Sequence, residues 1–191
     1  MKVVAFNCSP RKNGNTSHMI QETFKVLNAE GIETEMIQVG GTAIRGCTGC
    51  GTCGKTKDLR CVMDDDIINL CVKKMVEADG ILIGAPTYFA DVNTEAKALI
   101  DRTGYVLKRN GGPVKRKVGA ALVASRRLGG IHAFDTINHF FTISEMITVG
   151  SSYWNVSIAQ MEGDFEKDLE GVSTVKVLAE NMAWLLKKIK E

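Results

Sequence analysis

The stretch "KVVAFNCSPRKNGNTS", Lys2 to Ser17, passes from a strand pattern through a polar loop into a helix pattern. Residues 2–7 are mostly apolar and lack the alternation of a half-exposed strand, which is typical of a strand covered on both faces. Helical spacing of apolar residues follows over 16–30. Strand, polar loop and helix in this order indicate the first unit of a parallel α/β sheet.

The same alternation continues along the chain. Strand-length apolar runs follow at 33–39, 80–86, 117–124 and 146–150, and helix patterns at 65–78, 94–108, 131–144 and 171–189. We therefore expect an α/β fold with a doubly wound, five-stranded parallel sheet and helices on both faces. The flavodoxin-like order 2-1-3-4-5 is favoured, although periodicity leaves a Rossmann order open. No repeat or linker interrupts the pattern, so we expect a single domain over 1–191.

The composition argues against nucleic acid and membrane as partners. Charged residues make up 24% of the chain and the net charge is +2, without the basic stripe that nucleic-acid binding needs. No apolar run approaches the roughly 18 residues of a membrane span, and the N-terminus does not resemble a signal peptide. We expect a cytoplasmic protein that binds neither nucleic acid nor membrane. In that compartment clustered cysteines more often bind metal or react than form disulfides.

The loop after the first strand is predicted to bind phosphate. In an open α/β sheet a ligand lies beyond the carboxyl ends of the strands, where the strand order reverses. The candidate groups in this loop are Ser9, Arg11, Asn15, Thr16 and Ser17. Free backbone N–H groups at a helix N-terminus, hydroxyls and a guanidinium all suit an anion. The alternative is that residues 15–17 only cap the helix. Neither a P-loop pattern nor G-x-G-x-x-G is present.

Two further loops complete the predicted ligand site. After the third strand come Pro86, Thr87, Tyr88 and Phe89, and after the fourth come Ser125, Arg126, Gly129 and Gly130. Aromatic walls would suit a planar ring, and paired glycines would let backbone approach it. Aromatics folded over the core edge and a tight turn without ligand are the alternatives. Together, the three loops favour a mononucleotide with a planar ring, above all FMN.

The stretch "GCTGCGTCGKTKDLRC", Gly46 to Cys61, lies in a cysteine-rich loop over 44–64. Its thiols, Cys47, Cys50, Cys53 and Cys61, are candidate ligands of a [4Fe-4S] cluster. Structural zinc sites usually present two separated C-x2-C pairs, which makes zinc the weaker alternative, and thiol or disulfide chemistry is a third. Because the loop follows the second strand, we expect the metal and the flavin at the same edge of the sheet.

Several motifs together resemble a known family. "SPRKNGNTS", "CTGCGTCGKTKDLRC", "DDDI", "ADGILIGAPTYF" and "EAKALIDR", in this order, resemble the iron-sulfur flavoprotein family within the NAD(P)H-dependent FMN reductase branch of the flavodoxin-like proteins. The resemblance covers nearly the whole chain, and the compact cysteine motif is its specific part. It implies one FMN and one [4Fe-4S] cluster per subunit, electrons from ferredoxin, and dimers or tetramers in which a cluster approaches a neighbour's flavin.

Carried onto this sequence, the resemblance implies that Cys47, Cys50, Cys53 and Cys61 bind the cluster. It also implies that the FMN phosphate is bound by Ser9, Arg11, Asn15, Thr16 and Ser17, and that 86–89 and 125–130 frame the ring. Two departures are Asn7-Cys8, where Gly-Ser is more usual, and the long gap before Cys61. The second departure concerns the spacing of the fourth cluster ligand.

The expected function is electron transfer from a ferredoxin-like donor through the cluster to FMN and on to an acceptor. No side chain is expected to act as a general acid or base, because the cofactors carry the redox chemistry. Lys55, Lys57 and Arg60, in the cysteine loop, would steer an acidic donor or simply face solvent. The alternatives are an NAD(P)H-dependent FMN or quinone reductase without a cluster, and a thiol redox sensor or binding module.

Overall fold

A parallel sheet forms the centre of the computed structural model, which describes residues 1–190. Its strands are β1 (Lys2–Asn7), β2 (Glu33–Gln38), β3 (Gly80–Tyr88), β5 (Val118–Ser125), β6 (Ile147–Thr148) and β7 (Val156–Ile158). The order β2-β1-β3-β5-β6, with parallel neighbours throughout, confirms the predicted flavodoxin-like arrangement. A short β4 (Asp91–Val92) pairs antiparallel with the end of β3.

The fifth strand differs from the prediction because it consists of two pieces. β6 pairs with the first residues of β5, Val118 and Gly119. The chain then leaves the sheet, and β7 pairs with the last residues of β5, 123–125. The predicted run 146–150 corresponds to β6 only. β7 is three residues long, which is too short for a periodic sequence signal.

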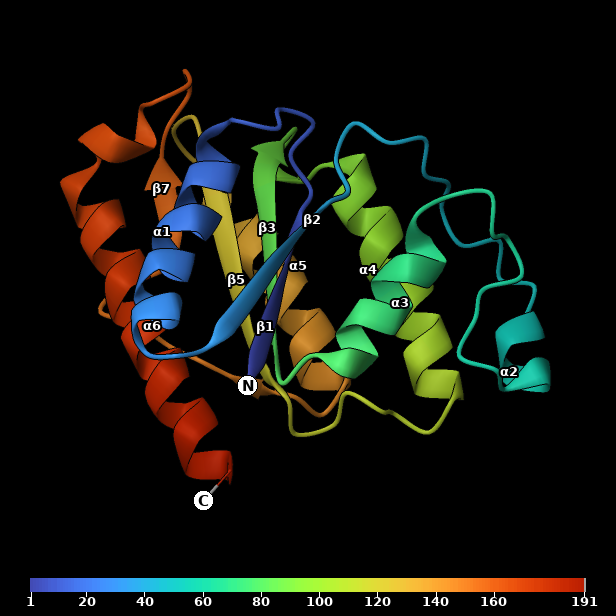
Figure 1. Ribbon diagram of the computed structural model, residues 1–191. Coiled ribbons are helices and arrows are strands. Elements are labelled where there is room, and N and C mark those ends of the chain that lie inside the picture. Colours follow the sequence, from blue (N-terminus) through green and yellow to red (C-terminus); the bar gives the residue numbers. More distant parts are fainter. Residues whose placement is uncertain (191) are drawn as a thin grey trace.

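Helices cover both faces of the sheet (Figure 1). One face carries α1 (Asn15–Ala29) and α6 (Leu169–Lys190), and the other carries α3 (Ile68–Glu77), α4 (Thr94–Arg109) and α5 (Gly130–Ile143). The predicted bounds agree to within two residues except at the start of α3, where Asp66 lies before the helix and accepts a hydrogen bond from Ile68 N–H. A five-residue α2 (Thr52–Thr56) and a 3-10 turn, η1 (Phe165–Lys167), are additional elements.

Two apolar cores lie on the two faces. Phe6, Ile83 and Phe141 belong to the core under α3, α4 and α5, and Leu82 and Met182 to the core under α1 and α6. Each of these side chains is fully buried, and a buried side chain of this size contributes roughly 1.5–3 kcal/mol. The cores fix the strands, and the strands in turn fix the loops at their carboxyl ends.

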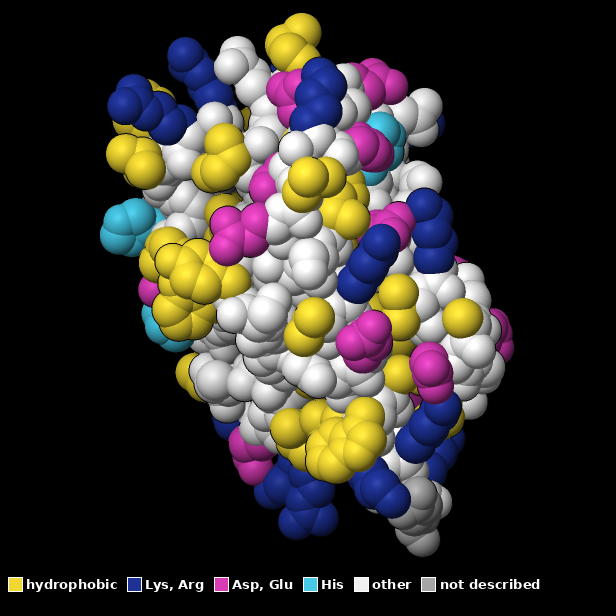
Figure 2. Space-filling view, turned by 90° about the vertical axis from the view of Figure 1, so that its left-hand side faces the viewer, with side chains coloured by type: hydrophobic (Ala, Val, Ile, Leu, Met, Phe, Trp, Pro, Cys, Tyr) yellow, Lys and Arg dark blue, Asp and Glu magenta, His cyan; other side chains and the backbone are white. Residues whose placement is uncertain are grey.

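The cysteine-rich loop does not belong to either core layer. It leaves the carboxyl end of β2, passes outside α4 and reaches α2 before returning to α3 (Figure 1). The opposite side of the molecule carries separate patches of hydrophobic side chains among charged ones (Figure 2). Within residues 1–190, no helix has both the length and the apolarity for a membrane crossing.

Candidate functional site

A cleft of about 150 Å³ lies at the carboxyl edge of the sheet. The residues that line it are Ser9, Arg11, Gly14, Asn15, Thr16, Pro86, Thr87, Tyr88, Ala124, Arg126, Ala159 and Gln160. The first loop, the third-strand loop and the fourth-strand loop thus meet as the sequence predicts. Gly14, Ala124, Ala159 and Gln160 were not predicted. The last two follow β7, the strand that the sequence pattern missed.

The loop after β1 presents the start of α1 to this cleft. Ser9 N–H donates to Asn7 Oδ1 at 3.1 Å, and Ser9 Oγ accepts from Arg11 N–H at 3.2 Å, which folds the loop tightly. Gly14 precedes the helix, and no side chain caps it. The first N–H groups of α1 are therefore open to a ligand, and the helix dipole favours an anion there. This geometry fits the phosphate of FMN.

Two predicted phosphate residues also hold a distant segment, 160–165. Arg11 Nη1 donates to Gln160 O at 3.1 Å, and Asn15 Nδ2 donates to Met161 O at 2.8 Å. Asn15 Oδ1 accepts from Phe165 N–H at 3.2 Å. Ser17 does not line the cleft, because its buried hydroxyl accepts from Gln21 on the next turn. These contacts hold the segment against the phosphate loop, and its first residue, Gln160, forms part of the cleft wall.

A hairpin supplies the aromatic side of the cleft. Phe89 and Ala90 form its tip with φ of 42° and 77°, a left-handed conformation that is rare for residues with side chains. The Phe89 side chain is fully exposed and does not line the cleft, whereas Tyr88 is half-exposed and does. Thr87 Oγ1 is buried and has no hydrogen-bond partner within residues 1–190. A buried hydroxyl in a cleft wall needs a partner, and a bound flavin would supply one.

The loop after β5 shapes the cleft more than it lines it. Arg126 belongs to the lining, whereas Ser125 is buried and donates to Leu128 O at 3.3 Å. Gly129, which directly precedes α5, has φ of +89°, and an added Cβ would lie 3.6 Å from Thr87. Gly130 is buried, and its Cβ would lie 2.5 Å from Val156. The two glycines let α5 start close to the hairpin and β7.

The four predicted metal ligands surround a second, smaller cavity. Its lining comprises Cys47, Thr48, Gly49, Cys50, Gly51, Cys53, Cys61, Val62, Met63, Arg102, Tyr105 and Val106. The two glycines have φ of +67° and +72°, which lets the backbone turn tightly between thiols. Within residues 1–190, no three metal-ligating side chains converge as a ready-made single-ion site. The donor set of four thiols, without carboxylate or imidazole, suits an iron-sulfur cluster.

Neighbouring residues donate hydrogen bonds to two of these thiols, those of Cys47 and Cys50. Gly49 N–H donates to Cys47 Sγ at 3.4 Å. Hydrogen bonds from the side chain and backbone of Thr52, and from the Thr48 hydroxyl, lower the pKa of the exposed Cys50 thiol. Burial raises the pKa of Cys53, and the other three thiols of the cavity raise it further by charge repulsion. Such repulsion means that four thiolates would gather here only around a cation or metal cluster.

The cysteine loop is fastened by side chains from α3, from α4 and from Asn110, the residue that follows α4. Asn110 Nδ2 donates to Cys53 O at 3.1 Å, and Asn110 Oδ1 accepts from Leu59 N–H at 3.1 Å. Asn69 bonds both the N–H and the carbonyl of Cys61, at 2.7 and 3.0 Å. Arg102 is fully buried and pairs with Asp66. None of these fastening residues was predicted from the sequence.

The expectation that metal and flavin share one edge of the sheet is wrong for the thiols themselves. The loop begins at that edge, but its cavity lies against Arg102, Tyr105 and Val106, well along α4. The first residue of α4, Thr94, lies near the flavin edge, and twelve residues of α-helix span about 18 Å. Within one chain the two candidate sites are therefore well separated (Figure 1).

The loop after β1, which is the predicted phosphate loop, contacts Gly40 in the segment that follows β2. An added Cβ there would lie 2.2 Å from Cys8 O and from the Ser9 carbonyl carbon, so only glycine fits. Gln38 Nε2 donates to both Ser9 O and Gly40 O, at 2.7 and 2.8 Å. The segment that leads from β2 to the cysteine loop is thus packed directly on the phosphate loop.

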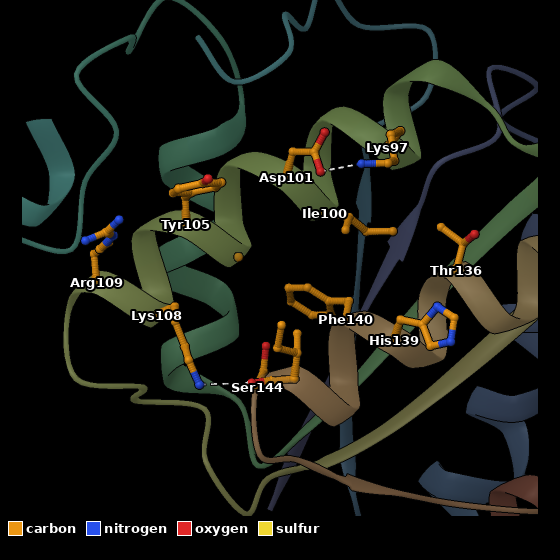
Figure 3. Close-up of a pocket in the computed structure, with 12 residues that line it drawn as sticks. Lys97, Ile100, Asp101, Tyr105, Lys108, Arg109, Thr136, His139, Phe140 and Ser144 are labelled. Atoms are coloured by element: carbon orange, nitrogen blue, oxygen red, sulfur yellow. Dashed lines mark hydrogen bonds and ion pairs between the residues drawn. The ribbon is translucent and has the colours of Figure 1, made fainter. Parts of the chain in front are cut away.

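A larger groove, with a volume of about 880 Å³, lies between α4 and α5. Figure 3 shows Ile100 and Phe140 in its floor, and Lys97, Asp101 and Lys108 around them. It contains no predicted cofactor residue. Tyr105 lines both this groove and the cysteine cavity, so the groove borders the candidate metal site.

The two remaining cysteines do not belong to either site. Cys8 and Cys71 are both fully buried. Burial raises the pKa of Cys71 to about 12 and that of Cys8 well above its usual range. Both thiols are consequently inert packing groups.

Comparison with known proteins agrees with this geometry. Residues 1–160 match the family model described as NADPH-dependent FMN reductase. The chain belongs to the NADPH-dependent FMN reductase family. Within the family it is a homologue of iron-sulfur flavoproteins. It is 35% identical to an iron-sulfur flavoprotein of Methanocaldococcus jannaschii over 100% of both chains, and 33% identical to one of Methanosarcina thermophila over 100% of this chain and 98% of that one.

Solved structures support the fold of this FMN reductase homologue. RosB with a bound 8-demethyl-8-formylriboflavin-5'-phosphate intermediate has a TM-score of 0.76 at 16% identity, covering 100% of this chain and 80% of that one. A flavodoxin from the domain Archaea has a TM-score of 0.63 at 16% identity over 98% and 99% of the two chains. The predicted membership of the iron-sulfur flavoproteins is confirmed, and the protein is a flavin-dependent redox protein.

Proposed function

We propose that this protein is an electron-transfer oxidoreductase that passes electrons from a ferredoxin-like donor through a [4Fe-4S] cluster to FMN and on to an acceptor. The observation that carries the proposal is the cavity surrounded by Cys47, Cys50, Cys53 and Cys61 in a homologue of iron-sulfur flavoproteins. When bound, the cluster supplies one-electron chemistry, and FMN stores electrons for the acceptor. The protein holds and separates the two groups.

The residues of the cleft would bind FMN in distinct ways. The N–H groups at the start of α1 and the guanidinium of Arg11 would bind the phosphate. Tyr88 would cover one side of the ring, and the unpaired Thr87 hydroxyl would bond a polar ring atom. Arg126 would contribute a second positive charge at the cleft. No side chain is assigned a proton-transfer role.

The donor would dock on the outer side of the cysteine loop. Lys55, Lys57 and Arg60 are exposed there, and Arg109 packs under Gly54 beside the adjoining groove. This positive charge would attract an acidic one-electron donor and raise its rate of association. Because the two sites of one chain are well separated, we also propose self-association as a dimer or tetramer, which would shorten the path between a cluster and a neighbour's flavin.

A double variant tests the electron path. Cys50→Ser with Cys53→Ser removes two thiols on the outer loop and leaves the cleft intact, so FMN should stay bound. In anaerobic rapid mixing with reduced ferredoxin, we expect fast flavin bleaching in the parent protein and at least a tenfold slower rate in the variant. Equal rates would contradict the proposal. Cys71→Ser is the matched control because its thiol is buried outside the site.

The family assignment favours a second candidate, an NAD(P)H-dependent FMN or quinone reductase. In that case NAD(P)H would reduce the flavin directly, and the cysteine variant would react as fast as the parent protein. Anaerobic flavin bleaching with NADPH and with reduced ferredoxin, measured side by side on both proteins, separates the two candidates.

A further inference from the structure

Arg102 is the only fully buried arginine within residues 1–190, and the function derived above does not use it. Its side chain is 0% exposed and that of its ion-pair partner Asp66 is 3% exposed. Burying a charged pair is expensive and often adds no stability. A guanidinium in such a place therefore calls for a reason beyond packing.

The contacts of Arg102 converge on the two stems of the cysteine loop. Nη1 donates to Asp66 and to Arg45 O, the latter at 3.2 Å. Nη2 donates to Met63 O at 2.7 Å. Arg45 precedes the first cysteine of the loop, whereas Met63 and Asp66 follow the last. One side chain on α4 thus joins the beginning and the end of the loop.

Arg102 also touches a thiol. Nη2 lies 3.4 Å from Cys61 Sγ, and both residues line the cysteine cavity. Its Nε–H is buried and has no acceptor within residues 1–190. The guanidinium stays charged at every relevant pH, and among residues 1–190 its bonded carboxylate is that of Asp66. A fixed positive charge and a donor are therefore directed at the ligand set.

We propose that Arg102 is a positioning residue that fixes Cys61 as the fourth cluster ligand and raises the reduction potential of the cluster. The inference rests on the proposed cluster site. Reduction adds a negative charge to the cluster, and a nearby cation with a hydrogen bond to a ligand sulfur stabilises that state. Arg102 would thereby make the cluster easier to reduce by the donor.

The matched variants are Arg102→Met, Arg102→Lys and Asn110→Ala. Asn110 fastens the same loop through Cys53 O and Leu59 N–H, but it is neutral and, among residues 1–190, its side chain bonds no thiol. Loss of loop anchoring should thus affect all three, whereas loss of charge affects only Arg102→Met. Arg102→Lys keeps the charge and loses the forked geometry. Bound FMN, measured by absorbance, reports whether each variant has folded.

The measurement is an anaerobic redox titration of the cluster followed by electron paramagnetic resonance, together with iron and sulfide content. For Arg102→Met we expect a tenfold lower ratio of reduced to oxidised cluster at a given potential, which is about 59 mV for one electron. Its cluster content should fall as well, since outer-shell partners of a metal site typically change affinity by 10–100-fold. Arg102→Lys should retain most of the potential, and Asn110→Ala should match the parent potential.

Three results would overturn the inference. They are an unchanged potential and cluster content in Arg102→Met, an equal shift in Asn110→Ala, and a full Arg102→Met shift in Arg102→Lys. If Arg102→Met does not fold, the decision passes to Arg102→Lys and Asn110→Ala. A shift of about 59 mV or more in Arg102→Lys, or a shift in Asn110→Ala as large as that in Arg102→Lys, then rejects the role of the charge. Parent protein with FMN but neither iron nor sulfide would instead reject the proposed function.

Discussion

The flavin cleft and the cysteine loop are held by different kinds of interaction. The cleft is built on the ends of β1, β3 and β5, whose backbones pair in continuous parallel register above two apolar cores. The cysteine loop is mostly exposed, contains one five-residue helix and depends on Asn69, Arg102 and Asn110. The first site is a property of the fold, whereas the second depends on a few side chains. Each can therefore be disabled separately.

The strongest test of this separation is Cys61→Ala. We expect iron and sulfide in anaerobic preparations to fall to background, because a cluster with three thiolates is poorly held, while FMN content stays at the parent level. Cys71→Ala, which removes a buried thiol of the core, is the control and should keep its iron. Unchanged iron in Cys61→Ala would show that the ligand set is wrong.

Gly40→Ala should affect both regions, because Gly40 lies in the segment that leads from β2 to the cysteine loop and packs on the phosphate loop. The new methyl group would meet backbone atoms at 2.2 Å, and overpacking of this kind costs about 1–3 kcal/mol. The thermal midpoint should fall and FMN binding should weaken together. Gly46→Ala is the control, since nothing lies within 4 Å of its added Cβ. Equal stability of both variants, measured by calorimetry, would contradict the close contact.

Arg11→Met tests the flavin cleft without altering the cysteine loop. Loss of one charge-assisted hydrogen bond to phosphate, about 1.5–3 kcal/mol, should weaken FMN binding roughly 10- to 100-fold without changing cluster content. The neighbouring Lys12 is exposed and does not line the cleft, so Lys12→Met should bind FMN normally. Fluorescence titration of flavin-free protein gives both dissociation constants. Equal constants would remove Arg11 from the site.

Thiol reactivity provides the mildest test. A lowered pKa means that Cys50 becomes thiolate, the reactive form, at lower pH than an ordinary cysteine. Cys71, with a pKa of about 12, has roughly one part in ten thousand as thiolate at pH 8. In cluster-free protein, iodoacetamide should label Cys50 first as the pH rises from 6 to 8, and should leave Cys71 unlabelled. Mass spectrometry that found Cys71 labelled as early as Cys50 would contradict the burial.

The same contrast explains what could be predicted from sequence. Strand runs such as 80–86 and the loops behind them carry local signals, so the fold and most of the cleft lining followed from pattern. Cysteine spacing likewise indicated the thiols. The segment 160–165 could not be placed, because its contacts with Arg11 and Asn15 join residues about 150 apart.

The position of the thiols along α4 could not be predicted from the sequence either, because the loop is held by side chains that lie far from it in the chain. One signal was available. Arg102 lies three residues after Leu99 and four before Val106, which places a charge on the apolar face of a helix. A charge at such a position is rarely buried unless it is paired, so it indicates a partner elsewhere in the chain.

The most direct test of the account is the composition of protein purified under strict exclusion of oxygen. The account predicts one FMN, four iron and four acid-labile sulfide per chain, with broad absorption near 400 nm beneath the flavin bands. FMN with neither iron nor sulfide, or with one zinc per chain, would contradict it and leave a flavin reductase without a cluster.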